Sequence, residues 1–514
     1  MTGTRPFWLL SVFAFAVLGA ASVWMGGLNQ DEGWYLYAAQ MVAEGHLPYR
    51  DFFFTQGPIM PFVYSAFAWV LRGWGLLGAR VLTLAVGAAG LLFAVALARR
   101  LVHGNERKNL AGLTVFLLLG GNLYHLYYLT IPKTYALASL FVAVGFYLLA
   151  VAFGDKRGDD APARPSWSRA GVAALAGLSL AFAAGTRISL GAILPVVGLW
   201  LLCARDWRRL GWFCVGGFAG LALVYGPFLL NPAARDGLLA AQRYHAARGG
   251  FDLVWTVGSF SRLVRWYLPV FVLLGLVGYE VLGANKDRVS TAPSTQHPAP
   301  STLLLLAFLA VFAVQMLAPF PYEDYQVPVM GLLAVYAAVA FGALDFDAGR
   351  PWLKPLLVLG MTWACSFGSP LLEKWSTNGQ DRFWSLKKPK TELAQLREVA
   401  REINALDPGG KDILTQDLYL AIETGRKVPR GLEMGPFAML SDAEWRTLLR
   451  TAPCGVAALS GYSFAVNPPK CDERPVSDQM EYWSILKRSY ELVSREEHFG
   501  QNQTTLLVLK RKVR

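Results

Sequence analysis

The chain has 514 residues, of which 54% are hydrophobic and only 16% are charged, and its mean hydropathy is +0.35. An ordinary soluble domain has about 45–50% apolar and about 25% charged residues. The composition therefore excludes a disordered chain, a coiled coil, a small disulfide-rich toxin and an ordinary cytosolic enzyme. Residues 1–370 hold 26 basic and 17 acidic side chains, whereas the much shorter segment 371–514 holds 22 and 19. This distribution predicts a multi-span α-helical membrane domain at 1–370 and a water-soluble domain at 371–514.

The membrane domain contains about eleven predicted spans. A helix needs about 20 mostly apolar residues to cross the hydrocarbon core of a bilayer, and about 17–25 are tolerated. The first predicted span also resembles a signal peptide, so a cleaved leader is the alternative to a retained anchor. The predicted spans are 7–27, 77–98, 109–128, 132–153, 169–186, 188–204, 211–230, 264–283, 302–319, 327–344 and 355–372.

Short basic loops predict the orientation, because Lys and Arg are retained on the cytoplasmic side. Each even-numbered span is followed by basic residues, for example Arg99 and Arg100 after the second span and Arg208 and Arg209 after the sixth. We therefore expect a multi-pass protein of the inner (plasma) membrane. Its N-terminus is expected to be cytoplasmic and its C-terminal domain extracytoplasmic.

Three stretches on the expected outer side favour helices that lie in the membrane interface. Residues 33–45 and 59–72 are too polar to be spans and too hydrophobic to be free loops, and both have helical periodicity. Residues 231–262 form a third stretch, with basic and aromatic side chains between two spans. Trp and Tyr are enriched at membrane interfaces, which supports this placement.

The distribution of charges within the spans argues against a transport pathway. Proton- and ion-coupled transporters usually have ionisable residues at mid-membrane and paired broken helices in two halves. We place no Asp, Glu, Lys or Arg at the middle of a predicted span. The remaining charges cluster at the outer face among aromatic residues, which indicates a site at the membrane surface.

The first outer loop begins with an acidic pair, Asp31-Glu32, directly before a predicted amphipathic helix. Asp is a preferred N-cap residue and Glu favours the first helical turn, so the pair could serve only to start the helix. A capping carboxylate can still face a cavity, so a catalytic role stays open beside the structural one.

The acidic pair and the residues after it resemble a known family. An aromatic-rich helix, the run Gly-x-Leu-Pro-Tyr at 45–49, Asp51 and a helix started by Pro58 follow the pair. This order resembles the lipid-linked-sugar glycosyltransferases with the GT-C fold, in particular the protein O-mannosyltransferases and the lipid A aminoarabinose transferases. The resemblance continues through 77–80 and 319–328 and covers residues 1–345. Many relatives have Pro-Pro where this chain has Gln56-Gly57-Pro58, so the subfamily and the acceptor stay open.

The resemblance implies a GT-C-like fold and an inverting enzyme. Such an enzyme transfers a hexosyl or pentosyl residue from a polyprenyl-phosphate carrier to an acceptor hydroxyl outside the cytoplasm. In the family the first acid of the pair is the general base, which implies Asp31 as the base and Glu32 as its substitute. General-base assistance contributes about 10²–10⁴-fold to such a rate. Asp51 could bind the acceptor or have only a structural role.

The partners expected for such an enzyme are membrane lipids, the lipid-linked sugar and a glycan, lipid or protein acceptor, and we expect neither a nucleic acid nor a separate cofactor.

The leaving phosphate requires cations, and four basic residues of the outer face are candidates: Lys133, Arg187, Arg80 and Arg243. Lys133 and Arg187 lie in very short outer loops, where the orientation rule does not favour basic residues. Snorkelling to lipid headgroups explains both of them equally well.

Further candidates for sugar and acceptor contacts lie near the outer ends of the spans. Tyr128 and His125 belong to an aromatic cluster that could stack on a sugar, although an aromatic interface belt explains the cluster without function. Glu323-Asp324 is a second outer acidic pair that could bind the acceptor or, with Asp31, a divalent metal. Two acidic pairs without His or fixed spacing are weak evidence for a metal site, so none is predicted.

The C-terminal segment has the pattern of a small α/β layer fold. Helices are predicted at 391–406, 441–451 and 478–494, and strands at 411–416, 454–460 and 504–510. The segment has no phosphate-binding Gly loop and no nucleophile motif, so we expect an accessory domain beside the outer site. In an oxidising compartment Cys454 and Cys471 could form a disulfide.

Two other classes of function compete with the enzyme hypothesis. One is a flippase or transporter of lipid-linked sugars, and the other is a non-catalytic scaffold in envelope glycan assembly.

Overall fold

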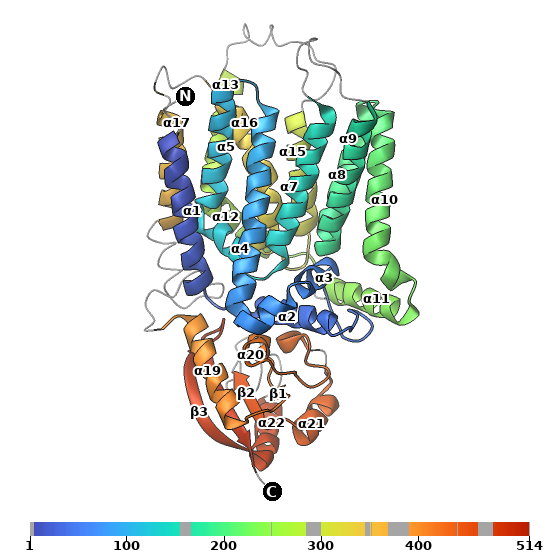
Figure 1. Cartoon of the computed structure of the whole chain (residues 1–514), viewed down its shortest axis with the longest axis vertical. Helices are drawn as coiled ribbons and strands as arrows, with labels where there is room; N and C mark the ends of the chain where they lie inside the picture. Colours follow the sequence, from blue (N-terminus) through green and yellow to red (C-terminus); the bar gives the residue numbers. More distant parts are fainter. Residues whose placement is uncertain are drawn as a thin grey trace.

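The computed structural model shows a tall bundle of helices, a thin layer of helices across one end of it, and a small α/β domain beyond that layer (Figure 1). The structure describes residues 5–154, 166–247, 249–283, 300–344, 350, 352–367, 390–438, 440–460 and 476–512. Cys471 lies outside these residues, so the Cys454–Cys471 disulfide stays a prediction, whereas the Cys454 side chain is buried.

The bundle consists of helices that mostly coincide with the predicted spans, although the helix at 253–266 overlaps the stretch 231–262 that was predicted to lie in the interface. They are α1 (Arg5–Met25), α4 (Ala68–Leu101), α5 (Asn105–Gly120), α6 (Leu123–Thr130), α7 (Thr134–Phe153), α8 (Ser166–Thr186), η1 (Ile188–Ala192), α9 (Ile193–Cys203), α10 (Trp207–Leu229), α12 (Leu253–Trp266), α13 (Leu268–Gly283), α15 (Pro300–Met316), η2 (Glu323–Gln326), α16 (Val327–Gly342) and α17 (Leu353–Phe367).

Six helices of the described part are long and apolar enough to cross a membrane, or up to eight if each bent pair of helices forms one span. The chain is therefore a multi-pass membrane protein. Three shorter apolar helices, at 188–203, 301–316 and 353–366, coincide with further predicted spans. Hydropathy thus located the helices, but it does not establish eleven full-length crossings.

The predicted span 109–128 is not straight, because α5 and α6 meet at an angle of 72°. Asn122 stabilises this break. Its side chain accepts a hydrogen bond from the His125 amide at 3.1 Å, which caps α6, and it donates one to the Trp266 carbonyl at 2.8 Å. Trp266 ends α12, where the chain turns by 85° into α13. One amide side chain therefore links both bent helix pairs.

The layer across the end of the bundle contains α2 (Gln30–Ala43), α3 (Ile59–Ser65) and α11 (Pro232–Ala247) (Figure 1). The helix predicted at 33–45 is α2. The helix predicted at 59–72 is divided between α3 and the first turns of α4, and α4 itself is broken at Gly75. Gly75 has φ 58° and ψ −140°, a conformation that favours glycine.

The C-terminal domain has a four-stranded sheet in the order β1-β2-β4-β3. The strands β1 (Ile413–Leu414) and β2 (Val456–Ser460) pair in parallel, and β4 (Thr504–Arg511) pairs antiparallel with β2 and with β3 (Tyr490–Phe499). The helices and the 3-10 turn of this domain are α19 (Glu392–Leu406), α20 (Leu418–Thr424), η3 (Gly435–Phe437), α21 (Asp442–Thr451) and α22 (Val476–Ser489).

The helix predicted at 478–494 was wrong in its last residues. The helix α22 ends at Ser489, and residues 490–494 belong to β3, which pairs with β4. Partners distant in the chain supply the ladder hydrogen bonds, and this tertiary pairing overrides the local helical preference of Glu and Arg.

The C-terminal domain and α2 share one hydrophobic core, which joins residues of α2, α3, α19, α20 and the sheet. A Cβ at Gly33 of α2 would lie 2.6 Å from the Tyr419 amide nitrogen of α20, so the two helices are in direct contact. The Val428 amide also donates to the Tyr37 hydroxyl at 3.1 Å. The helix that begins with the acidic pair is therefore held between the bundle and the C-terminal domain.

Candidate active site

The start of α2 assigns different tasks to the two acidic residues. Asn29 is the N-cap, and its side chain accepts a hydrogen bond from the Asp31 amide at 3.1 Å. The Glu32 carboxylate accepts one from the Asn29 amide at 2.9 Å, which completes a capping box. The side chain of Asp31 caps nothing. Of the two interpretations of the acidic pair, capping therefore applies to Glu32, and the Asp31 carboxylate is available for another contact.

Glu32 also forms a buried ion pair with Arg80 of α4, in which both side chains are fully buried. The Arg80 guanidinium donates to both carboxylate oxygens, at 2.6 and 2.7 Å, and to the carbonyls of Val23, Gly26 and Gly27. This cluster joins the end of α1 to α2 and α4. Neither residue lines a described cavity, so the geometry supports neither Glu32 as a substitute base nor Arg80 as a phosphate ligand.

The Asp31 carboxylate faces the N-terminal ends of α7 and α16. One oxygen accepts a hydrogen bond from the Trp34 indole at 3.0 Å, and the other lies 2.9 Å from Lys133 Nζ. The same ammonium lies 3.4 Å from Asp324 Oδ2, which also accepts a hydrogen bond from the Tyr135 hydroxyl at 2.8 Å. Lys133 therefore bridges two carboxylates that are 293 residues apart in the chain.

The surroundings keep Asp31 ionised. Burial raises the pKa of the carboxyl, but Lys133, the Trp34 hydrogen bond and Arg187 outweigh burial and hold the pKa below its ordinary value. About a quarter of the side chain is exposed to the cavity, at 27%. A carboxylate that is charged and still accessible can accept a proton from a bound hydroxyl.

Arg187 is the second cation of the site, and it has a different environment from Lys133. Its guanidinium lies over the rings of Tyr135 and Tyr325, at 4.8 and 4.6 Å from their centroids, and it donates to Thr134 Oγ1 at 3.2 Å. In the described part of the chain no carboxylate lies within ion-pair distance of it. Aromatic faces stabilise this cation without neutralising it, so Arg187 can bind an incoming anion.

Two hollows meet at Arg187. The polar hollow, of about 240 Å³, contains Asp31, Trp34, Lys133 and Asp324. The second hollow, of about 350 Å³, is mostly apolar and includes the exposed, bundle-side residues Ile188 and Val314. The two hollows share Thr55, Gln56, Arg187, His245 and Tyr325. Together they form one cavity, in which a guanidinium separates a carboxylate end from an apolar limb whose lining includes exposed side chains of the bundle.

The C-terminal domain closes the polar end of this cavity. Phe437, Gln501 and Asn502 line the polar hollow, and the latter two residues lie at the tip of the β3–β4 hairpin. Gln501 Oε1 accepts a hydrogen bond from the Gln30 amide, next to Asp31, at 2.7 Å. Sequence patterns gave no indication of these residues, because a polar hairpin tip is identical in composition to an ordinary turn.

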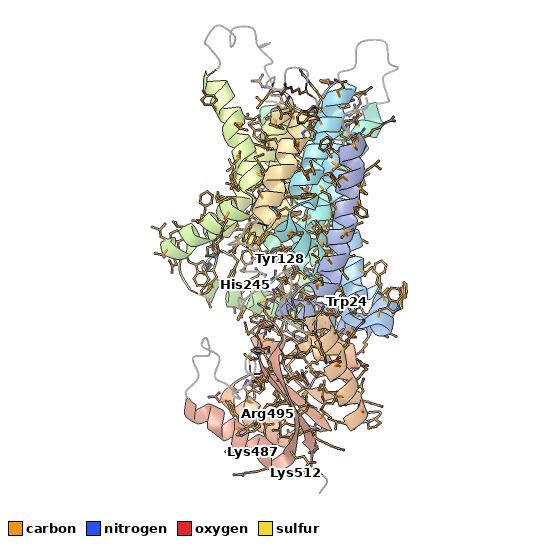
Figure 2. All side chains as sticks on the ribbon, turned by 90° about the vertical axis from the view of Figure 1, so that its left-hand side faces the viewer. Trp24, Tyr128, His245, Lys487, Arg495 and Lys512 are labelled. Carbon is orange, nitrogen blue, oxygen red and sulfur yellow. The ribbon has the colours of Figure 1, made fainter. Side chains whose placement is uncertain are left out.

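Several of the predicted residues lie outside the cavity. Tyr128 is buried and packs on Tyr135 with 5.3 Å between ring centroids, and the His125 ring hydrogen-bonds the Tyr267 hydroxyl at 2.8 Å. The centroid of the Tyr128 ring also lies 5.5 Å from Lys133 Nζ, so it contacts a residue of the site, whereas His125 belongs to the packing behind it. Figure 2 labels Tyr128 and His245 near the junction of the bundle and the C-terminal domain.

The other three outlying residues are paired or exposed. Glu323 pairs with Arg262 at 2.9 Å, Asp51 pairs with Arg50 at 2.7 Å, and Arg243 lies on α11 outside the lining of both hollows. The Arg50 hydrogen bond lowers the pKa of Asp51 to about 2. Other residues of α11 do line the cavity: Leu238, Gln242, Tyr244 and His245, of which His245 Nε2 donates to the Thr55 carbonyl at 2.7 Å.

Among the described residues no group of three or more His, Cys, Asp and Glu side chains could hold a metal ion. At the site itself, the Lys133 ammonium lies between the Asp31 and Asp324 carboxylates, in the space that a shared cation would occupy.

Comparison with solved structures identifies the fold. The structure of ArnT from Cupriavidus metallidurans bound to undecaprenyl phosphate is similar to this chain with a TM-score of 0.65 and 15% identity, over 98% of each chain. The apo state of the same protein gives a TM-score of 0.63. An oligosaccharyltransferase from Archaeoglobus fulgidus has a TM-score of 0.52 and 12% identity, over 87% of this chain and 68% of that chain. No family model and no curated protein matches the sequence. The chain therefore has the GT-C fold that the sequence resemblance implied.

Proposed function

We propose that this protein is a glycosyltransferase that moves one sugar from a polyprenyl-phosphate carrier to an acceptor hydroxyl, with inversion and with Asp31 as general base. One observation carries the proposal: a single cavity holds an accessible, ionised carboxylate, a guanidinium without a carboxylate partner among the described residues, and an apolar limb, in that order. This order matches the acceptor, the phosphate and the lipid tail of such a reaction.

The chemistry follows from that order. The acceptor oxygen attacks the anomeric carbon while its proton moves to the Asp31 carboxylate. The bond between the anomeric carbon and the phosphate oxygen breaks, and its electron pair leaves with the phosphate. Arg187 stabilises the negative charge that develops there. Lys133 and Trp34 hold the Asp31 carboxylate in place, and Asp324 holds Lys133.

The apolar limb is the proposed site of the first isoprene units of the carrier. Its lining contains Ile188, Tyr225, Leu238, Val314 and Phe320. Burial of apolar chain contributes about 25 cal/mol per Å², so the limb favours a lipid-linked donor over a soluble sugar phosphate. The fold is shared with ArnT, whose structure contains undecaprenyl phosphate, and this supports the assignment.

The remaining features of the proposal come from the sequence. Basic loops favour the inner membrane with the site and the C-terminal domain outside the cytoplasm. In this topology nucleotide sugars are absent, so the lipid carries the activated sugar. The reaction requires no cofactor other than this donor, and the acceptor is an outer-face glycan, lipid or protein.

The test is transfer by the purified, full-length protein in lipid nanodiscs. A panel of undecaprenyl-phosphate-linked hexoses and pentoses is supplied with an envelope extract as the acceptor, and release of undecaprenyl phosphate is measured by mass spectrometry. We expect Asp31→Asn to lower the rate by about 10²–10⁴-fold. Asp236→Asn is the matched control, because this carboxylate is 74% exposed on α11 and lies outside the cavity.

Two outcomes would contradict the proposal. If Asp31→Asn transfers sugar as fast as Asp236→Asn, the base is assigned wrongly. If the protein moves lipid-linked sugars between leaflets of a vesicle without releasing undecaprenyl phosphate, it is a transporter. Failure of every donor in both assays would favour the scaffold.

A further inference from the structure

A second, larger cleft lies away from the candidate active site. Its volume is about 810 Å³, and it shares no lining residue with the two hollows that contain Arg187. Its walls come from the end of α2, the first turns of α4, one face of α19 and the end of α20. Figure 2 shows Trp24, at the end of α1 and part of this cleft, on the opposite side of the junction from His245.

Exposed tryptophans line this cleft or lie beside its lining residues in the chain. Trp24, Trp69 and Trp74 are 43%, 71% and 61% exposed, and Trp24 and Trp74 are part of the lining. Trp settles at the headgroup level of a bilayer. Residues 68–74 precede the break of α4 at Gly75, where the chain turns into the bundle. The exposed tryptophans therefore favour a position of this cleft at the headgroup level.

The acidic residues of the cleft are all neutralised within the protein. Glu423 pairs with Arg397 at 3.0 Å and Glu44 pairs with Lys427 at 2.7 Å, while Glu398 pairs with Lys390. Glu423 also accepts a hydrogen bond from the Leu76 amide at the break of α4. Of these contacts, the Glu44–Lys427 pair joins the C-terminal domain to α2, and the Glu423–Leu76 hydrogen bond joins it to α4.

Two basic residues of the cleft, Arg72 and Arg401, have no carboxylate partner among the described residues, unlike the other three. The cleft is lined by Arg72, Arg397, Arg401, Arg426 and Lys427, and of these Arg426 binds Asp407. Within the described ranges, neither Arg72 nor Arg401 has a carboxylate within 4 Å, and both are exposed. Arg401 donates through Nε to the Arg397 carbonyl at 3.3 Å. The membrane domain and the C-terminal domain thus each supply one guanidinium group without a counter-charge to this cleft.

We propose that this cleft binds the phosphate group of an anionic lipid from the leaflet beside the C-terminal domain. Arg binds phosphate through paired N–H donors, and such charge-assisted hydrogen bonds are short and strong. A lipid, rather than a soluble anion, fits the exposed tryptophans of the cleft. The bound phosphate would link Arg72 of the membrane domain to Arg401 of the C-terminal domain. This inference does not depend on the proposed transfer reaction.

The test is native mass spectrometry of the full-length protein in a neutral detergent, titrated with dioleoylphosphatidylglycerol or dioleoylphosphatidylcholine. We expect one saturable phosphatidylglycerol adduct that phosphatidylcholine does not reproduce. The double variant Arg72→Gln/Arg401→Gln should weaken it by at least about tenfold, because charge-assisted hydrogen bonds are lost. The double variant Arg450→Gln/Arg488→Gln is the matched control, since both residues are exposed on the C-terminal domain outside the cleft. It should bind as the wild type does.

Three outcomes would overturn the proposal. Equal binding by the Arg72→Gln/Arg401→Gln variant would place the lipid elsewhere, and equal binding of phosphatidylcholine would remove the role of charge. Displacement of the lipid by millimolar glycerol 3-phosphate would identify a soluble anion as the ligand. Each single variant is measured as well, so that a misfolded double variant does not decide the result.

Discussion

The substitution Glu32→Gln tests whether the second acid of the pair is structural or catalytic. Glu32 and Arg80 are both fully buried, and the Arg80 guanidinium makes five hydrogen bonds, two to Glu32 and three to carbonyls at the end of α1. The introduced glutamine would keep the volume and the hydrogen bond from the Asn29 amide, but it would leave Arg80 buried without a counter-charge. Breaking a buried pair in this way costs about 3–5 kcal/mol.

The measurement is a double-mutant cycle on unfolding of the purified protein in detergent. Arg80→Met alone leaves the Glu32 carboxylate buried and should cost a similar amount. The double variant Glu32→Gln/Arg80→Met removes both charges, so it should be more stable than the sum of the single effects predicts. Glu444→Gln is the control, because Glu444 occupies the same position in the exposed capping box of α21, and glutamine is accepted there. Its unfolding midpoint should equal that of the wild type.

The same variants separate stability from catalysis. Folded Glu32→Gln protein should retain the rate of transfer per molecule, because Glu32 does not line the cavity. If Glu32→Gln unfolds within about 1 kcal/mol of the wild type, the pair contributes far less than a buried pair should. If it unfolds normally but loses transfer, Glu32 and not Asp31 acts as the base, and the argument from the capping box is wrong.

Three further predictions concern the cavity and the domain contact. Because Lys133 lowers the pKa of Asp31 against the effect of burial, kcat/KM should stay flat from about pH 5 to about 8. In Lys133→Gln one of the groups that lower the pKa of Asp31 is lost, so the fall of kcat/KM at acidic pH should begin at a higher pH. An unchanged pH profile would contradict the assignment of Asp31 as the general base. Asn502→Ala should raise the acceptor KM by about tenfold through a lost hydrogen bond, with donor affinity unchanged in a binding titration. Gly75→Ala places a Cβ against the Glu423 carboxylate at φ 58°, so it should destabilise the protein by about 1–3 kcal/mol in thermal unfolding. A wild-type midpoint would show that the break of α4 does not need glycine.

The two cations Lys133 and Arg187 show how much of the site local sequence patterns predicted. Their unusual place in short loops singled out both Lys133 and Arg187, and both line the cavity. The pattern could not distinguish them, because the difference lies in their partners. Lys133 is held by two carboxylates that are far apart in the chain, and Arg187 is held by aromatic faces.

The aromatic residues near the site show what local sequence patterns did not predict. Tyr128 and His125 have the composition of a sugar platform, but both are buried and neither lines the cavity. Tyr135 and Tyr325, in equally aromatic surroundings, contact Arg187 directly. Helix packing decides which face of such a cluster meets the cavity, and periodicity alone does not report it.

The sequence by itself predicted an apolar helical region, a polar α/β tail and an acidic pair after the first predicted span, because hydropathy and charge density are properties of local sequence. The tertiary structure decided what each acid does. Asn29 and Glu32 complete the cap, Arg80 neutralises Glu32, and Asp31 is the carboxylate left facing Lys133 and the cavity. The hairpin tip at Gln501 closes that cavity by binding Gln30, which precedes it in the chain by 471 residues. Contacts of this kind depend on which elements pack together, and a pattern within one segment does not contain that information.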